Sequence, residues 1–60
     1  MLILERRKGE AINVWIDGRV AIQIVVNEVR GDRVRLGFQA DKSIKIVREE
    51  LGDPDGRDYG

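Results

Sequence analysis

Apolar and polar residues alternate with a period of two along the body of the chain, the pattern of β-strands with one buried face. Val and Ile together supply 14 of the 60 residues and Ala only three, a bias typical of sheets. No segment carries apolar residues at convincing helical spacing. The expected strands are residues 1–7, 11–16, 19–29, 33–38 and 43–48. We therefore expect an all-β domain of five short antiparallel strands.

Glycines mark the expected turns between these strands. Gly9 follows the first strand and is free to adopt the positive φ that other residues avoid. Asp17-Gly18 is a typical type I′ hairpin sequence, and residues 30–32 provide the second hairpin. The longest strand has room to bend, which predicts a bulge near Glu28.

Alternation assigns most apolar side chains to one face of the expected sheet. The inward residues are Ile12, Val14, Ile16, Val20, Ile22, Ile24, Val26, Val34, Leu36, Phe38, Ile44 and Ile46. The first strand differs, because residues 1–4 are all apolar and both of its faces should therefore be covered. A strand inserted between others or donated to a partner meets that condition.

The composition changes after residue 51. Residues 52–60 contain three Gly, one Pro and no apolar period, so we expect them to form a disordered tail behind a single domain of residues 1–51. The formal net charge is zero, but the domain carries ten Lys and Arg against eight Asp and Glu, whereas the tail carries one against three. A mildly basic body with an acidic tail results.

A chain of this length buries too little apolar surface to be more than marginally stable alone. Small domains usually add disulfides, a metal or a partner chain, and this sequence has no Cys and no His, which leaves self-association. The same absences exclude thiol and imidazole chemistry and nearly every zinc site. With no Thr and one Ser, Ser43, we expect neither an enzyme nor a bound cofactor or metal. No apolar run reaches the ~18 residues of a membrane span, which predicts a cytoplasmic protein.

Basic residues gather at both ends of the expected domain. Three lie together at residues 6–8, and Lys42, Lys45 and Arg48 lie along the last strand. One interpretation is ordinary edge-strand charge that prevents sheet-to-sheet aggregation. The other is a rim that positions nucleic-acid phosphates. Composition does not decide between them, and aromatic residues for base stacking are scarce.

Three segments resemble the carbon storage regulator family (CsrA/RsmA). They are MLILERRKGE at residues 1–10, VRGDRVRLGF at 29–38 and ADKSIKIVREEL at 40–51. The resemblance covers residues 1–51 and implies a strand-swapped homodimer, in which the first and last strands insert into the partner's sheet. It further implies a bacterial RNA-binding regulator that recognises GGA motifs in mRNA leaders and represses translation initiation or alters mRNA stability. Small RNAs with GGA loops would compete for the same sites.

The resemblance also implies roles for individual residues. Leu4 matches the leucine that packs on the recognised purines, and Arg6 and Arg7 match a basic pair near the phosphates. Arg48 matches the arginine most closely tied to binding, whose guanidinium can stack on guanine and form forked hydrogen bonds to it.

The remaining implied roles lie around the last strand. Ala40 and Lys42 match the loop that reads GGA largely through backbone groups, with Lys42 adding a phosphate contact, and Ile44 and Ile46 match apolar positions. The expected RNA-binding residues are thus Leu4, Arg6, Arg7, Ala40, Lys42, Ile44, Ile46 and Arg48.

The sequence departs from the family pattern at several positions. Asp41 stands where the family usually has Pro, and Val47 where it usually has His. The family normally continues into a C-terminal helix, which Gly52-Asp53-Pro54 stops here, so contacts with the family's protein antagonist are not carried over. The alternative is a diverged homodimer that binds a protein partner or another nucleic acid.

Overall fold

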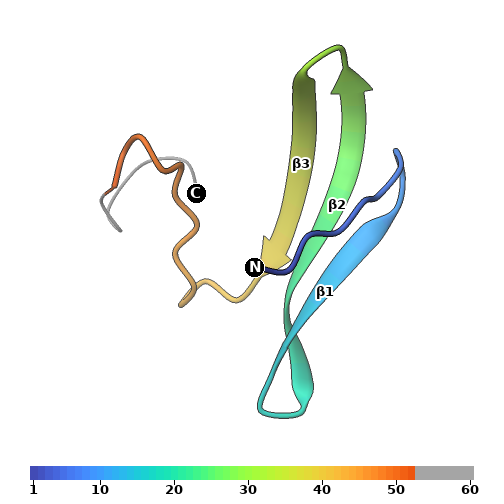
Figure 1. The fold of residues 1–60 in the computed structure, drawn as a ribbon. Coiled ribbons are helices and arrows are strands. Elements are labelled where there is room, and N and C mark those ends of the chain that lie inside the picture. The colour runs from blue at the N-terminus through green and yellow to red at the C-terminus, as the bar shows by residue number, and fades with distance from the viewer. Residues whose placement is uncertain (53–60) are drawn as a thin grey trace.

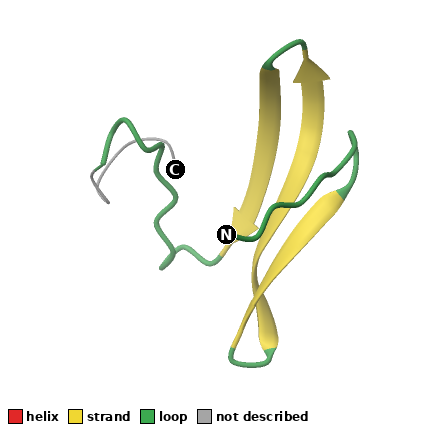
Figure 2. Ribbon diagram, in the orientation of Figure 1, coloured by secondary structure: helices red, strands yellow, loops and turns green. Residues whose placement is uncertain are grey.

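The computed structural model describes residues 1–52 and contains one antiparallel sheet (Figures 1 and 2). Its strands are β1 (Ala11–Ile16), β2 (Arg19–Arg30) and β3 (Arg33–Ala40), in the spatial order β1-β2-β3. The described residues include no helix, which confirms the all-β prediction. Both connections are tight because each hairpin loop contains only two residues.

In the two hairpin turns, the φ angles have the signs that the turn sequences predict. Asp17 and Gly18 both have positive φ, 52° and 77°, as a type I′ turn requires. In the second hairpin only Gly31 has a positive φ, 54°, which is the pattern of a type II′ turn. Primed turns match the right-handed twist of the flanking strands, so both hairpins form without splaying them.

A third turn leads the chain into β1. The Glu10 N–H donates to the Arg7 carbonyl at 2.9 Å, and Gly9 between them has φ of 87°, as in a type II turn. Gly9 and Glu10 together then face Val26: the Gly9 N–H donates to the Val26 carbonyl at 2.8 Å, and the Val26 N–H donates to the Glu10 carbonyl at 3.0 Å. This is a glycine bulge, and it sets the angle at which residues 1–7 leave the sheet.

We expect Gly9→Ala to lower the free energy of unfolding by about 1 kcal/mol, because a side chain disfavours positive φ by that amount. No other atom lies within 4 Å of a Cβ built on Gly9, so the loss comes from the backbone alone. Urea denaturation at one protein concentration measures it. Gly9→Asn should lower the free energy of unfolding by less, since Asn tolerates the left-handed region. Equal decreases for Gly9→Asn and Gly9→Ala would contradict this explanation.

The bulge expected near Glu28 is present. Val26 pairs with Leu36 and Glu28 pairs with Arg35, so Asn27 is an extra residue in β2. The sequence prediction was right here because a 12-residue strand must bend to stay in contact with a shorter neighbour.

A second irregularity changes the expected face of one residue. Val14 pairs with Ile22, but Trp15 pairs with Val20, so Ala21 is an extra residue in β2. Residues directly opposite each other share a face of the sheet, which places Val20 with Trp15 and away from Ile22. The prediction of Val20 on the inward face was therefore wrong, because simple alternation does not survive an inserted residue.

One face of the sheet is apolar, and nearly all of its residues are only half-buried or exposed. Its cross-strand rows are Ile12–Ile24–Phe38, Val14–Ile22–Ala40 and Val26–Leu36. Val26, 7% exposed, is the one buried residue among those described, whereas Leu36 and Phe38 are 48% and 43% exposed. A single chain therefore has an apolar surface but almost no enclosed core.

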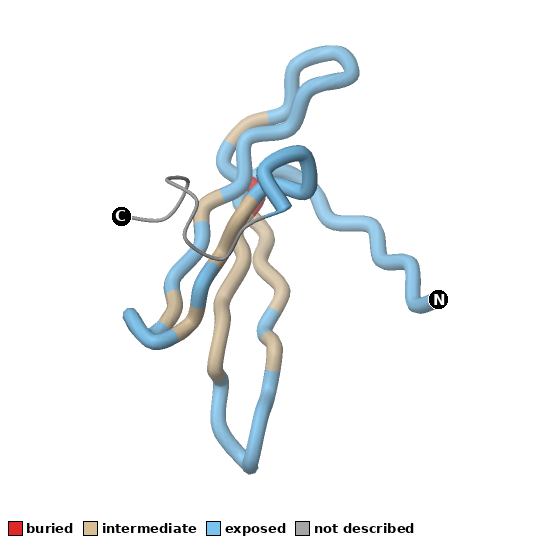
Figure 3. The backbone as a smooth tube through the Cα atoms, turned by 90° about the vertical axis from the view of Figure 1, so that its left-hand side faces the viewer, coloured by how far each residue is buried: buried red, intermediate tan, exposed pale blue. Residues whose placement is uncertain are grey.

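The first and last expected strands are not strands in the single chain, which has three strands within residues 1–52 rather than five. Residues 1–7 extend away from the sheet (Figure 3), and Met1 and Leu2 are more than 80% exposed. A strand exists only where a neighbouring backbone pairs with it, and the turn at Gly9 directs this segment off the ladder. Of the expected tail, residues 53–60 lie outside the described part of the chain.

Candidate nucleic-acid interface

An open hollow lies where the chain approaches the turn at Gly9. It has a volume of about 640 Å³ and is lined by Leu4, Glu5, Arg6, Arg7 and Glu10. The fold thus brings together three of the residues expected to bind RNA, one apolar and two basic. The turn holds them at the edge of the sheet, close to the start of β1.

The carboxylate of Glu10 joins these basic residues. It accepts hydrogen bonds from Arg6 through both oxygens, at 2.8 Å to Nη2 and 3.3 Å to Nε, and one from the Arg7 backbone N–H at 2.7 Å. The hydrogen bond from Arg6, followed by that from the Arg7 N–H, lowers the pKa of Glu10 below its ordinary value. Glu10 is therefore ionised throughout the neutral range.

The sequence pattern predicts only a turn at Glu10, so this contact was missed. The signal that could have found it is the spacing of Arg6 and Glu10, four residues apart on either side of a glycine turn. A turn reverses the chain and brings residues on its two arms together. Opposite charges placed there are expected to meet.

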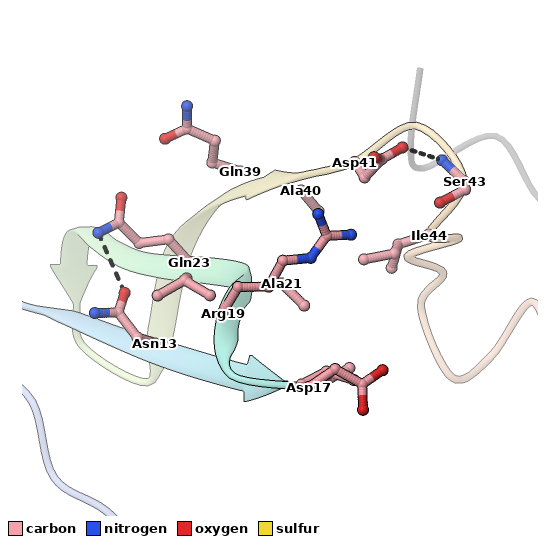
Figure 4. A pocket seen from close by; sticks show the side chains of 12 residues that line it. Asn13, Asp17, Arg19, Ala21, Gln23, Gln39, Ala40, Asp41, Ser43 and Ile44 are labelled. Atoms are coloured by element: carbon pink, nitrogen blue, oxygen red, sulfur yellow. Dashed lines mark hydrogen bonds between the residues drawn. The ribbon is translucent and has the colours of Figure 1, made fainter.

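A second, larger groove lies between the β1–β2 hairpin and the segment that follows β3 (Figure 4). Its volume is about 730 Å³, and two expected RNA-binding residues, Ala40 and Ile44, line it. The other lining residues are Asn13, Ile16, Asp17, Arg19, Val20, Ala21, Gln23, Gln39, Asp41 and Ser43. On its floor the Gln23 amide donates to the Asn13 side-chain oxygen across β1 and β2 at 3.3 Å.

Asp41 builds the turn beside this groove. Its carboxylate accepts the Ser43 N–H at 3.0 Å, and its carbonyl accepts the Ile44 N–H at 2.9 Å (Figure 4). The hydrogen bonds from Ser43, with a smaller effect of the nearby Arg19 charge, lower the pKa of Asp41 below its ordinary value. At a position where the resemblance leads one to expect Pro, Asp41 thus fixes the turn by hydrogen bonding instead.

The remaining expected residues lie further along the last segment. Lys42 and Arg48 are exposed and Ile46 is half-buried, and none of the three lines either hollow. The Arg48 carbonyl accepts the N–H groups of Leu51 at 3.1 Å and Gly52 at 3.4 Å, which turns the chain after this residue. The segment leads away from the end of β3 (Figure 1).

The two sets of candidate residues do not form one site within a single chain. The hollow at residues 4–10 and the groove at residues 39–44 share no lining residue. Within residues 1–52 no helix has the length and apolar character needed to cross a membrane. The same residues contain no cluster of three or more acidic side chains that could hold a metal ion.

Comparison with known proteins gives one consistent result. Residues 1–54 match the family described as CsrA, Global regulator protein family. A "Translational regulator CsrA" from Syntrophomonas wolfei is 45% identical over 51 residues, which is 85% of this chain and 62% of that protein. Proteins of the same name from Rhodopirellula baltica and Thermotoga maritima are each 45% identical, over 53 and 51 residues, 88% and 85% of this chain and 70% and 57% of theirs. The chain thus spans less than two thirds of the Syntrophomonas protein, and no solved structure gave a significant match.

Proposed function

The chain belongs to the CsrA global regulator family, and we propose from this premise that it is an RNA-binding post-transcriptional regulator acting in the cytoplasm. It recognises GGA motifs in mRNA leaders and represses translation initiation or alters mRNA stability, without catalysis or a cofactor. The observation that carries the proposal is the extent of the family match, which includes every candidate residue from Leu4 to Arg48. Residues 1–51 are the RNA-binding domain.

The functional unit is a homodimer with exchanged strands. The uncovered apolar face and the exposed apolar residues at the N-terminus both support this arrangement. In the dimer, residues 1–7 and 43–48 of each chain pair with the partner's sheet, which restores five strands per chain. An apolar surface of this kind on so small a domain calls for a partner, and a second copy offers the same surface.

Dimerisation also completes the binding site. Residues 1–7 of one chain then lie beside residues 43–48 of the other, so the hollow that holds Arg6 and Arg7 meets the partner's Arg48. This geometry accounts for the separation of the two sets of candidates in one chain. It gives two equal sites on opposite edges of the dimer.

Each group in the site has a distinct part in recognition. The Arg48 guanidinium forms forked hydrogen bonds to a guanine edge, and Leu4 packs against the purines. Arg6, Arg7 and Lys42 contact phosphates. The loop that follows Ala40, the last residue of β3, reads the bases through backbone groups. This requires unpaired nucleotides, because sequence-specific recognition of RNA mostly targets unpaired loop bases.

Two sites per dimer suit the proposed regulation. A dimer bound to GGA in a leader occludes the ribosome-binding site, and a second GGA on the same RNA raises the apparent affinity through its high local concentration. Small RNAs with several GGA loops compete by the same contacts.

Fluorescence anisotropy with a labelled RNA hairpin tests the proposal. We expect tight binding when GGA is in the loop and much weaker binding when it is replaced by CCA. The log-log salt slope should be about −2 to −4, as expected for about three to five phosphate contacts at roughly −0.7 each. Equal, weak binding of both RNAs would contradict the proposal and favour a protein partner.

Asp41→Asn is expected to tighten RNA binding about twofold at low salt, because it removes one negative charge beside the proposed loop. The Asn side-chain oxygen can still accept the Ser43 N–H, so the turn is retained. Anisotropy titrations at several salt concentrations measure the gain, which should vanish as salt rises. Asp32→Asn, in the hairpin loop between β2 and β3, removes the same charge and is the control. An equal gain in RNA affinity for Asp32→Asn would contradict an effect specific to Asp41.

A further inference from the structure

The hollow at residues 4–10 contains an acidic group in the middle of a basic surface. Glu10 is held there by three N–H donors, two from the Arg6 guanidinium and one from the Arg7 backbone. Its backbone is fixed as well, since the Glu10 N–H and carbonyl bond to Arg7 and Val26. The position of this carboxylate is therefore set by the turn itself, whereas Arg6 is a long, exposed side chain on the segment that leads into the turn.

The contact uses a defined edge of the guanidinium. Glu10 binds the side formed by Nε and Nη2, at 3.3 and 2.8 Å. A guanidinium has a second edge, formed by Nη1 and Nη2, whose N–H groups point away from a carboxylate on the first. That second edge matches the oxygens of a phosphate.

We propose that Glu10 is a positioning residue for RNA binding: it holds the Arg6 guanidinium by one edge so that the other faces an RNA phosphate. This inference rests on the proposed function and adds to it a residue that contacts no RNA itself. Ordering an arginine before binding removes part of the entropy cost of binding. The pKa of Glu10, lowered by Arg6 and by the Arg7 N–H, agrees with a contact that persists at neutral pH.

Repulsion between Glu10 and the phosphate acts in the opposite direction, and the geometry indicates which effect is larger. The carboxylate charge is compensated by the Arg6 guanidinium at 2.8 Å, and the phosphate approaches the adjacent edge of that guanidinium, formed by Nη1 and Nη2. Exposed charges that are compensated and further apart interact weakly in water and salt. Positioning should therefore outweigh repulsion.

Glu10→Gln separates positioning from a purely structural role in the turn. The Gln side-chain oxygen can still accept the Arg7 N–H, but its amide nitrogen replaces the second oxygen and places a donor against Arg6 Nη2. We expect Glu10→Gln to bind the GGA hairpin about fivefold more weakly, the size of effect expected for an exposed charge pair of good geometry. The midpoint of thermal unfolding should be close to that of the unaltered chain.

The matched control is Glu28→Gln, which removes the same charge from a pair with Arg30 in which Nε and Oε1 are 3.5 Å apart. It should leave RNA affinity unchanged or slightly tighter. In an Arg6→Ala background, Glu10→Gln should cause no further loss of affinity and should tighten binding slightly, since the carboxylate then has no arginine to position and only repels the phosphate.

Three results would overturn the inference: affinity of Glu10→Gln equal to or above that of the unaltered chain, an equal loss in Glu28→Gln, or the same loss with Arg6 already removed. Each of these leaves GGA-dependent binding by the unaltered chain intact, and so leaves the proposed function intact. If the unaltered chain binds GGA and CCA hairpins equally, the proposed function fails first and the inference fails with it.

Discussion

Arg48→Ala is expected to weaken binding of the GGA hairpin about 100-fold, the largest effect of any single substitution in the proposed site. A forked contact between arginine and guanine is worth about 1–3 kcal/mol, and the loss of stacking adds to it. Arg48 is exposed in the single chain, and in the proposed dimer its side chain faces the RNA and not the dimer contact, so its removal should leave folding and the dimer intact. Anisotropy measures the affinity, and light scattering measures the mass of the protein.

Two control substitutions make this prediction specific. Arg48→Lys keeps the charge but cannot form the forked hydrogen bonds, and its affinity for the GGA hairpin should still fall about tenfold. Arg33→Ala removes an equal charge from the start of β3, where Arg33 pairs with Arg30 beside the hairpin turn, and should lose no more than about twofold. Similar losses for Arg48→Ala and Arg33→Ala would mean that Arg48 contributes only general charge.

Leu36→Asp is expected to abolish the folded dimer. Leu36 lies opposite Val26 on the apolar face and is 48% exposed in the single chain. If a second copy covers that face, the substitution buries an unpaired carboxylate and costs more than about 4 kcal/mol, which exceeds what so small a domain can lose. Circular dichroism and light scattering should show an unfolded or monomeric chain.

Val20→Asp is the matched control for this prediction. Val20 is 42% exposed, close to the value for Leu36, but it pairs with Trp15 on the other face. We expect Val20→Asp to give a folded dimer with nearly unchanged stability. If Leu36→Asp were tolerated as well as Val20→Asp, the apolar face would have to be open in solution, and the exchanged dimer would be wrong.

The parts of the fold that could be predicted from sequence are those with local causes. Asp17-Gly18 forms a type I′ turn because both residues tolerate positive φ, and Gly9 takes a conformation that suits no other residue as well. The bulge near Glu28 was also predictable, since the length of β2 demands a bend. In each case the residues that decide the structure are adjacent in the chain.

Features that depend on register or on a second chain could not be predicted in this way. Ala21 could be recognised as an extra residue only by pairing Trp15 with Val20, so the face of Val20 was assigned wrongly. Glu10 was missed for another reason: its spacing from Arg6 points to a contact only once the turn at Gly9 has been placed between the two residues. The strands expected at residues 1–7 and 43–48 came from the alternation pattern, and the single chain does not form them; they stay a prediction about the dimer.

Native mass spectrometry of the protein mixed with the GGA hairpin tests GGA binding by a homodimer, because one spectrum reports both the number of chains and the number of RNAs. We predict two chains without RNA, and two chains with two hairpins when RNA is in excess. The CCA hairpin should give almost no complex at the same concentrations. A single chain bound to one RNA, or equal complexes with GGA and CCA, would contradict a homodimer that reads GGA through sites shared between its two chains.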